Sequence, residues 1–375
     1  MRNVIDPTDL SKQEVDGILD LALDIIANRD KYSEACKGKK LATLFYEPST
    51  RTRLSFTSAM MELGGNVIGF SDAASSSVSK GETVADTTRV INCFADIIAM
   101  RHPIEGAPLV SALNSSTPVI NAGDGSHAHP TQTLTDLLTI RREIGHLDDL
   151  TIGFCGDLKF GRTVHSLIKA LSRYKNVKVY LIAPEQLRLP SYMKADVCDK
   201  YGVAYEEVSS MEEVIDKLDV LYMTRVQKER FLDEEEYEQV KDCFVLTADK
   251  LKNAKPTMRV LHPLPRVNEI AVDVDADPRA AYFRQVQNGK FVRMALMLTL
   301  LRWAEIEKGE NRLKAVDMVP PEELRGRKLI PEGTVSGKYR CPNPKCICNT
   351  EKVGTLFRPA AEGYRCLYCE SRPES

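Results

Sequence analysis

Short apolar runs that end in a polar turn and continue into a helical pattern recur along most of the chain, and they constrain its fold more than any other feature. The first run covers residues 40–46, and a turn around Pro48 joins it to residues 52–63, where apolar residues have helical spacing. The side chains expected on one buried side of this helix are Leu54, Phe56, Ala59, Met60 and Leu63. Repeated strand–turn–helix units fold into parallel sheets with crossover helices, so the sequence predicts an α/β protein.

The same pattern continues in two blocks, which predict two doubly wound parallel sheets. The further strands expected are 66–70, 95–100 and 119–122 in the first block, and 150–154, 177–182, 219–224, 243–246 and 259–261 in the second. A chain of 375 residues is too long for one core, and the apolar stretch 290–306 predicts a helix that completes the first domain. We therefore expect domains at 1–140 and 141–289, a linker at 307–338 and a small module at 339–375.

The turn after the first strand gathers hydroxyl and guanidinium groups on Ser49, Thr50, Arg51, Thr52 and Arg53. Backbone N–H groups and the helix dipole favour an anion at a helix N-terminus, and arginine pairs well with phosphate. The alternative is an ordinary Ser/Thr cap followed by solvated arginines. Two arginines and three hydroxyls within five residues favour the anion site.

Other polar groups follow the strands of both blocks, namely Arg101, His129 and Gln132 in the first and Arg162 and Arg225 in the second. The carboxyl ends of parallel strands share one edge of a sheet, so each block should present a basic rim. Two such rims predict a cleft for a small molecule with several negative charges. The alternative is that these arginines pair with local carboxylates on the surface.

Two further segments have competing interpretations. Residues 71–82 are small and polar, which is typical of a mobile linker, but Lys80 ends this loop just before a helix expected to begin near Thr83. The glycine-containing turn 155–165 resembles a dinucleotide-binding turn only superficially, because the GxGxxG pattern is absent.

The last part of the chain contains two close cysteine pairs, Cys341-x4-Cys346 and Cys366-x2-Cys369, which 19 residues separate. Four thiolates in two such pairs are typical of a tetrahedral structural zinc site, so we expect one structural zinc ion per chain rather than disulfides. Cys348 is either a spare thiol or a competing ligand. The five cysteines scattered earlier in the chain are expected to be buried thiols: Cys36, Cys93, Cys155, Cys198 and Cys243.

Composition excludes several classes of protein. A net charge of −2 argues against a main role in binding nucleic acid. No apolar run approaches the roughly 20 residues of a membrane span, and the N-terminal residues lack the basic-then-apolar pattern of a secretion signal. We therefore expect a cytoplasmic protein with no membrane and no nucleic-acid partner.

Seven ordered motifs resemble those of the aspartate carbamoyltransferase family: FYEPSTRTRLSF, SSSVSKGET, MRHP, HPTQTLTDL, GDLKFGRTVHSL, TRVQKER and HPLPR. The resemblance covers residues 1–306 and implies the carbamoyltransferase fold of the catalytic chain. The tail from Leu329, with CPNPKC and YRCLYC, resembles the zinc domain of the family's separate regulatory chain. The sequence therefore looks like a natural fusion of the two chains.

Two alternatives differ from this interpretation. Ornithine carbamoyltransferases share the STRTR and HPTQ turns, but they have HCLP where this chain has HPLP at 262–265. That difference, with the sequence RVQ at 225–227, favours a dicarboxylate acceptor. The second alternative is a non-catalytic, nucleic-acid-binding zinc protein with a degenerate transferase fold, but the site motifs are intact and no basic and aromatic stripe accompanies the cysteines.

The resemblance implies transfer of the carbamoyl group from carbamoyl phosphate to the amino group of L-aspartate, giving N-carbamoyl-L-aspartate and phosphate in de novo pyrimidine biosynthesis. It implies a carbamoyl-phosphate site made of Ser49, Thr50, Arg51, Thr52, Ser76, Arg101, His129, Gln132, Pro263 and Leu264. It implies an aspartate site made of Lys80, Arg162, Arg225 and Gln227. The catalytic residues would be Arg51, Thr52, His129 and Lys80, with no protein nucleophile and no catalytic cofactor.

The family also implies a homotrimer with shared active sites, because the residues that match Ser76 and Lys80 reach the neighbouring subunit's site. Glu47 would orient arginines across the domain interface when the cleft closes. The linker 307–338 is too short for the nucleotide-binding domain of a regulatory chain, so we expect no response to ATP or CTP. Pairing of trimers through the zinc modules, and docking of each module on its own or another chain, stay open.

Overall fold

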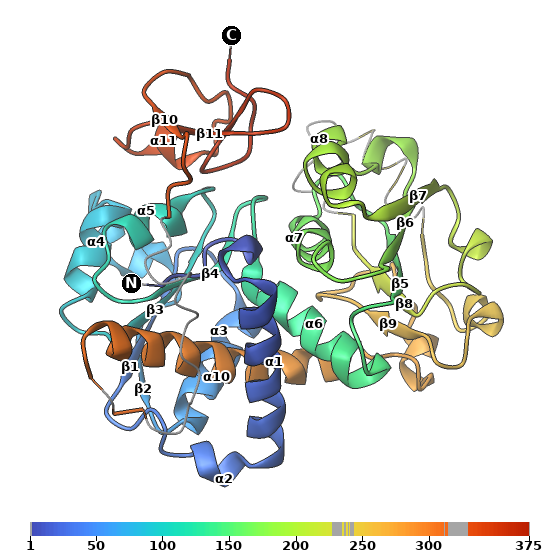
Figure 1. Ribbon diagram of the computed structural model, residues 1–375, viewed down its shortest axis with the longest axis horizontal. Coiled ribbons are helices and arrows are strands. Elements are labelled where there is room, and N and C mark those ends of the chain that lie inside the picture. The colour runs from blue at the N-terminus through green and yellow to red at the C-terminus, as the bar shows by residue number, and fades with distance from the viewer. Residues whose placement is uncertain are drawn as a thin grey trace. The chain divides into compact units, whose positions relative to one another are not determined.

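The computed structural model describes residues 2–226, 235, 238, 240, 244–310, 312–313 and 329–374. The chain forms two compact units, of which the first comprises Met1–Thr131 with Gly289–Ser375 and the second comprises Gln132–Asn288 (Figure 1). Helices α6 (Pro130–Ile144) and α10 (Tyr282–Glu307) contain the two points at which the chain passes from one unit to the other. The helix expected at 290–306 is therefore correct but begins earlier than predicted.

The first unit contains a parallel sheet of four strands in the order β2-β1-β3-β4. Its strands are β1 (Lys40–Phe45), β2 (Asn66–Phe70), β3 (Ile97–His102) and β4 (Val119–Asp124). In the register Leu41 lies beside Val67 on one side and Ile97 on the other. The central strands are buried on both faces, which explains why they form continuous apolar runs.

The helices of this unit are α1 (Lys12–Ala27), α2 (Arg29–Tyr32), α3 (Thr50–Glu62), α4 (Val84–Ile91) and α5 (Ala107–Leu113), with 3₁₀ turns η1 (Pro7–Asp9), η2 (Ala73–Ser75) and η3 (Ser77–Lys80). Four of the five side chains predicted on the buried side of the helix at 52–63 are buried, but Leu54 is 60% exposed. The prediction is wrong for Leu54 because it lies on the outward face of α3.

The second unit contains a parallel sheet of five strands in the order β7-β6-β5-β8-β9. Its strands are β5 (Thr151–Cys155), β6 (Lys178–Ile182), β7 (Ala204–Val208), β8 (Val220–Met223) and β9 (Arg259–Leu261). Its other helical elements are α7 (Arg162–Leu171), α8 (Ser191–Met193), η4 (Glu185–Leu187), η5 (Lys194–Asp199), η6 (Met211–Glu213), η8 (Lys250–Asn253) and η9 (Val272–Ala276).

Two strands of the second unit differ from expectation. The sequence did not predict β7, because this edge strand is partly exposed and its residues AYEEV form no apolar run. The strand expected at 243–246 is wrong over the described residues 244–246, where only Leu246 forms an isolated bridge, to Ile270. Both sheets are nevertheless parallel, which confirms the predicted α/β class.

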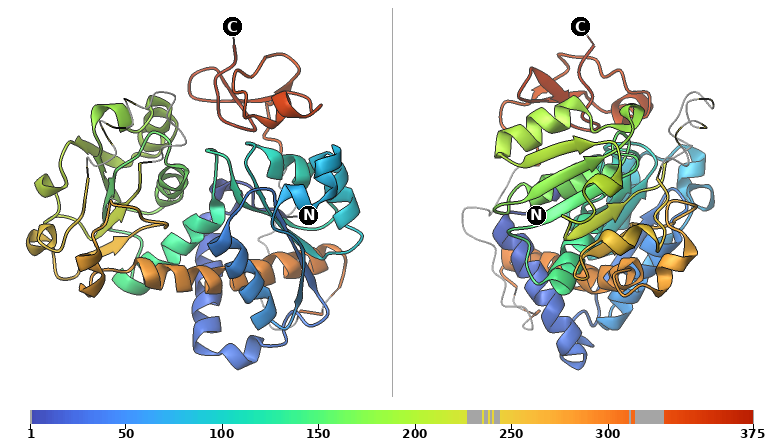
Figure 2. Two further views of the ribbon diagram at one scale, coloured as in Figure 1. Left: turned by 180° about the vertical axis from the view of Figure 1, so that it is seen from behind. Right: turned by 90° about the vertical axis from the view of Figure 1, so that its right-hand side faces the viewer.

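The C-terminal module belongs to the first unit and consists of the antiparallel strands β10 (Val335–Ser336), β11 (Leu356–Pro359) and β12 (Tyr364–Cys366) and the short helix α11 (Ile347–Thr350). It packs on α5 of its own chain (Figure 2), where Ala107, Val110, Phe357 and Tyr368 belong to one hydrophobic cluster. The sheet of the module begins before residue 339, the expected boundary. A search of the described helices found none with the length and apolar character needed to cross a membrane.

Candidate active site and metal centre

The strand order of the first unit reverses direction between its two central strands, β1 and β3. In open α/β sheets, ligands bind outside the carboxyl ends of the strands at such a reversal point. The turn 46–49 follows β1 there, and Arg101 lies in the last part of β3. The topology thus brings together two of the groups that the sequence analysis had selected separately.

The N-terminus of α3 lies directly after this turn. Ser49 occupies the N-cap position, but its side chain makes no capping hydrogen bond, so the alternative of an ordinary serine cap is not what the structure contains. The first backbone hydrogen bond of the turn runs from Arg53 N to Ser49 O at 3.1 Å. The N–H groups before Arg53 point out of the helix end, where an anion can accept hydrogen bonds from them.

Arg101 forms an ion pair with Glu47, with 2.8 Å between Nη2 and Oε1. Its Nη1 also lies 3.5 Å from the carbonyl oxygen of Ala122. Most of the Arg101 side chain is buried, with 14% exposed, so its orientation is well defined. Glu47 therefore orients an arginine within the first unit itself.

The turn that follows β4 folds around the carboxylate of Asp124, which is fully buried. Its Oδ1 accepts hydrogen bonds from the Asn121 side chain and from Ala128 N, at 2.8 and 3.1 Å. Its Oδ2 accepts one from Gly106 N at 2.9 Å and lies 3.0 Å from His127 Nδ1. These contacts fix the backbone immediately before His129, which is 5% exposed and precedes α6.

Arg293 is a further residue of this region that the sequence analysis missed. Its guanidinium donates hydrogen bonds to Ser55 Oγ at 3.1 Å and Thr131 Oγ1 at 3.3 Å. It also lies over the Phe56 ring, with 5.2 Å between the carbon atom Cζ and the ring centroid. Arg293 thus links α3 to the start of α6, and an arginine within the apolar stretch 290–306 was the available sequence signal.

Ser76 and Lys80 lie in the polar loop, which forms two 3₁₀ turns. The Ser76 hydroxyl donates to Ala73 O at 2.8 Å and accepts from Val78 N at 3.3 Å. Lys80 ends the second turn and is exposed. The loop therefore has a defined local conformation, and Lys80 is available at its surface.

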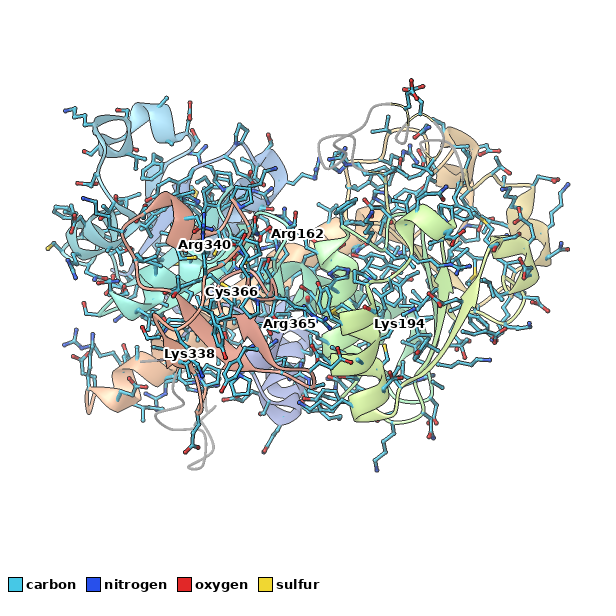
Figure 3. The ribbon with its side chains drawn as sticks, turned by 90° about the horizontal axis from the view of Figure 1, so that it is seen from above. Arg162, Lys194, Lys338, Arg340, Arg365 and Cys366 are labelled. Atoms are coloured by element: carbon cyan, nitrogen blue, oxygen red, sulfur yellow. The ribbon has the colours of Figure 1, made fainter. Side chains whose placement is uncertain are left out.

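The strand order of the second unit reverses between β5 and β8. Arg162, labelled in Figure 3, begins α7 after the turn that follows β5, and Arg225 follows β8. Thr224 joins the two turns, because its Oγ1 accepts from Asp157 N at 2.9 Å and donates to Cys155 O at 3.1 Å. Gln227, the third residue predicted to bind aspartate, lies outside the described residues.

The turn at 262–265 is held by the buried side chain of His262. Leu264 N donates to His262 Nδ1 at 2.7 Å, while His262 Nε2 lies 2.6 Å from Glu269 Oε1. Burial raises the pKa of Glu269, but hydrogen bonds from His262 and from backbone N–H groups outweigh this effect and lower the pKa overall. Leu264 has a φ of +54°, a left-handed conformation that is uncommon for a residue other than glycine.

Four cysteines of the module form a cluster that can hold a metal ion: Cys341, Cys346, Cys366 and Cys369. Their sulfur atoms lie within 4.8 Å of one another, and the Cys341–Cys369 and Cys346–Cys366 pairs are 3.4 and 3.7 Å apart. These separations exceed a disulfide bond of ~2.0 Å. Cys366 is labelled in Figure 3 together with three basic residues of the module, Lys338, Arg340 and Arg365.

Among the described residues, the scattered cysteines lie outside the metal-binding cluster. Cys36, Cys155 and Cys198 are buried, as predicted, and burial raises the pKa of Cys36 to about 12 and that of Cys198 to about 11. Cys93 is exposed, so the prediction is wrong for this residue, which lies in the turn before β3. Cys243 lies outside the described residues.

Comparison with protein families matches three consecutive parts of the chain. Residues 2–142 match the carbamoyl-P binding domain, and residues 148–300 the Asp/Orn binding domain, of aspartate/ornithine carbamoyltransferases. Residues 333–374 match the metal-binding domain of the aspartate carbamoyltransferase regulatory chain. The chain therefore belongs to the aspartate/ornithine carbamoyltransferase family and carries, in addition, a C-terminal metal-binding domain of the regulatory-chain type.

Individual members of this family give a more specific match than the family models. The chain is 62% identical over 301 residues to the aspartate carbamoyltransferase catalytic subunit of Lachnoclostridium phytofermentans, a match that covers 80% of this chain and 98% of that relative. The catalytic subunit of M. jannaschii aspartate transcarbamoylase matches with a TM-score of 0.76 and 48% identity, over 83% of this chain and 100% of that chain. Trypanosoma cruzi aspartate transcarbamoylase in complex with carbamoyl phosphate and aspartate matches with a TM-score of 0.75 and 39% identity, over 79% of this chain and 95% of that chain.

Proposed function

We propose that the chain transfers the carbamoyl group of carbamoyl phosphate to the amino group of L-aspartate, which yields N-carbamoyl-L-aspartate and phosphate for de novo pyrimidine biosynthesis. The observation that carries this proposal is the 62% identity to an aspartate carbamoyltransferase catalytic subunit over 98% of its length. A member of the same family has been solved with carbamoyl phosphate and aspartate bound.

The carbamoyl-phosphate site begins at the α3 N-terminus, where Ser49, Thr50, Arg51 and Thr52 bind the phosphate together with Arg101. The uncapped N-terminus of α3 supports this assignment. The ion pair between Arg101 and Glu47 supports a guanidinium whose direction is set before the substrate arrives. Ser76 from a neighbouring subunit completes this phosphate site.

The reaction needs orientation and electrostatic stabilisation rather than a protein nucleophile. The neutral amine of aspartate attacks the carbonyl carbon, and the bond from that carbon to the phosphate oxygen breaks. Arg51, Thr52 and His129 stabilise the charge that develops on the carbonyl oxygen. The nitrogen loses a proton that the departing phosphate can accept.

The two carboxylates of aspartate bind to Arg162, Arg225 and Gln227, with Lys80 contributed by a neighbouring subunit. The position of Arg162 and Arg225 at the strand reversal of the second unit supports the first two roles. The amino group of the carbamoyl moiety binds to Gln132 and to the carbonyl oxygens of Pro263 and Leu264.

The metal of the cysteine cluster is a structural zinc ion. Tetrahedral Zn–S bonds of ~2.3 Å place sulfur atoms ~3.8 Å apart, close to the 3.4 and 3.7 Å found for two of the cysteine pairs. Cys348 Sγ lies 3.3 Å from Cys346 Sγ and is a spare thiol beside the four ligands. Zinc takes no part in the reaction.

The chain acts as a homotrimer with shared active sites, located in the cytoplasm, and the zinc modules are assembly devices that can bridge trimers. The exposed position of Lys80 supports a role in a neighbouring site. Mixing of Lys80→Ala with Arg51→Ala chains tests this assembly, because hybrid trimers regain some sites that carry neither change. No recovery of activity after the two variants are refolded together would contradict shared sites.

The experiment that tests the activity is a carbamoylation assay with aspartate and ornithine side by side. We expect product with aspartate and a loss of about 100-fold or more in Arg51→Ala with its fold retained. Arg89→Ala is the matched control, because Arg89 is an exposed arginine paired with Asp86 on α4. Product with ornithine alone would overturn the assignment, and a CTP-dependent shift of the aspartate saturation curve would overturn the expected insensitivity to nucleotides.

A further inference from the structure

A buried carboxylate in the second unit connects Gln132 with the turn at 262–265. We propose that both bind the NH2 group of carbamoyl phosphate. Asp136 is fully buried and lies one helical turn after Gln132 in α6. Its Oδ1 accepts hydrogen bonds from Gln132 Nε2 at 2.7 Å and from Gln285 Nε2 at 2.6 Å. Its Oδ2 accepts one from Tyr222 Oη at 2.9 Å. The proposed catalytic roles do not use Asp136.

The bond to Asp136 determines the orientation of the Gln132 amide. A carboxylate only accepts hydrogen bonds, so the NH2 end of Gln132 must face Asp136. The carbonyl oxygen Oε1 then lies on the other side of the amide, as an acceptor. This is the orientation that recognition of a substrate NH2 group requires.

The second amide on Asp136, that of Gln285, continues the network to the turn at 262–265. Gln285 Nε2 binds Asp136, so Gln285 Oε1 is the acceptor that receives His262 N at 2.9 Å. His262 Nδ1 accepts the N–H of Leu264, which requires a lone pair on Nδ1 and therefore places the ring proton on Nε2, towards Glu269. The directions of these hydrogen bonds follow from the atoms that can only donate, the backbone N–H groups, and from the carboxylate of Asp136, which can only accept.

The end of this network is a pair of carbonyl groups. Within the part of the chain that the structure describes, no group donates a hydrogen bond to the carbonyl oxygen of Pro263 or Leu264. The N–H of Leu264 is engaged by His262, and proline has no N–H. The turn therefore offers acceptors and no donor.

We infer that Asp136 is a positioning residue that gives the site its selectivity for an acyl phosphate bearing an NH2 group. One carboxylate oxygen orients Gln132 directly and the Pro263–Leu264 turn through Gln285 and His262, so that three acceptors are held in a fixed arrangement. The inference rests on the proposed function, because it concerns recognition of carbamoyl phosphate. It predicts that the enzyme distinguishes this substrate from acetyl phosphate, in which a methyl group replaces NH2.

A purely structural role for Asp136 is the competing explanation, since its bond to Tyr222 ties α6 to β8. Burial and the neighbouring Asp136 carboxylate raise the pKa of Tyr222 well above its ordinary value, so its hydroxyl stays protonated and donates. Tyr222→Phe removes this bond and leaves the two amide contacts in place. The variant is therefore the matched control.

The test uses the full chain and measures the KM for carbamoyl phosphate and the inhibition constant of acetyl phosphate against it. In Asp136→Ala we expect the KM to rise tenfold or more while the inhibition constant of acetyl phosphate changes less than about twofold. Asp136→Asn should restore the KM, because its Oδ1 can accept from both glutamines while its NH2 donates to Tyr222 Oη. Tyr222→Phe should lower the melting temperature and leave both constants near their original values.

Gln285→Met provides a second variant if Asp136→Ala does not fold, because it breaks only the branch to His262, and we expect the same selective rise in KM. A parallel rise of both constants in either variant, or a selective rise in Tyr222→Phe, would overturn the inference. Failure of the unmodified chain to carbamoylate aspartate would instead overturn the proposed function.

Discussion

Gly106 is the position at which a single methyl group should loosen the metal-binding module from the rest of the first unit. This residue precedes α5 and has a φ of +85°. A Cβ atom at this position would lie 2.4 Å from Tyr368 Cβ and 2.9 Å from Tyr368 Cα. Gly38 is a matched control in the same unit, because its φ is +81° and no atom lies within 4 Å of a Cβ built there.

The magnitude follows from the difference between the two glycines. Both alanine variants incur the cost of a left-handed residue with a Cβ, about 1–2 kcal/mol. Only Gly106→Ala adds overpacking, at about 1–3 kcal/mol, and this term cannot be relieved by rotation of the tyrosine ring because the close atoms are Cα and Cβ. Tyr368 lies between Cys366 and Cys369, so the module must move as a whole.

Hydrogen exchange at two amides measures this loosening directly. Glu105 N donates to Lys345 O, and Ile347 N donates to Glu105 O, each at 3.0 Å, so both bonds exist only while the module is docked. A loss of about 1–3 kcal/mol corresponds to exchange about 5- to 150-fold faster in Gly106→Ala than in Gly38→Ala. After chelation of the metal the two variants should exchange alike. Equal exchange in the metal-loaded variants would refute the reasoning.

Three further predictions concern metal, pH and the link between α3 and α6. Removal of the metal should unfold the module and make the four cysteines of the cluster reactive towards a thiol reagent, whereas unchanged reactivity would show that the module folds without metal. Burial lowers the pKa of His102 and of His165 to about 4, below the ordinary value of 6.5, so the unfolded state binds more protons and stability should fall by about 2 kcal/mol per histidine between pH 7 and pH 5. Denaturant unfolding at both pH values checks this, and a flat profile would contradict it. Arg293→Met should raise the KM for carbamoyl phosphate several-fold, because it removes the hydrogen bonds to Ser55 and Thr131; an unchanged KM would show that α3 holds its position alone.

The parallel sheets could be predicted because their central strands are buried on both faces and therefore appear as unbroken apolar runs. The edge strand β7 has only partly buried residues and gives no such run, so it was missed. Leu54 shows a second limit. Helical spacing identifies a set of neighbouring positions, but it does not determine where the boundary between the inner and outer faces lies.

The candidate site residues could be selected from the sequence where they are local, at the ends of strands and the beginnings of helices. Long-range contacts could not be predicted in this way. Asp136 and Gln285 are 149 positions apart, and neither lies in a turn that attracts attention by its composition. Arg293 was missed for the same reason, because its partner Ser55 lies 238 positions away in the sequence.

Because the module docks on α5 of its own chain, the contact between them should persist when the protein is diluted. Glu105 accepts from Asn343 Nδ2 at 2.7 Å and from Ser126 N at 3.0 Å, so one carboxylate joins the module to the turn before His129. Because one polypeptide carries both partners, this contact forms at an effective concentration on the order of millimolar rather than at the concentration of a second protein. The contact can then be occupied even if its intrinsic affinity is modest, and its occupancy does not depend on the amount of protein present.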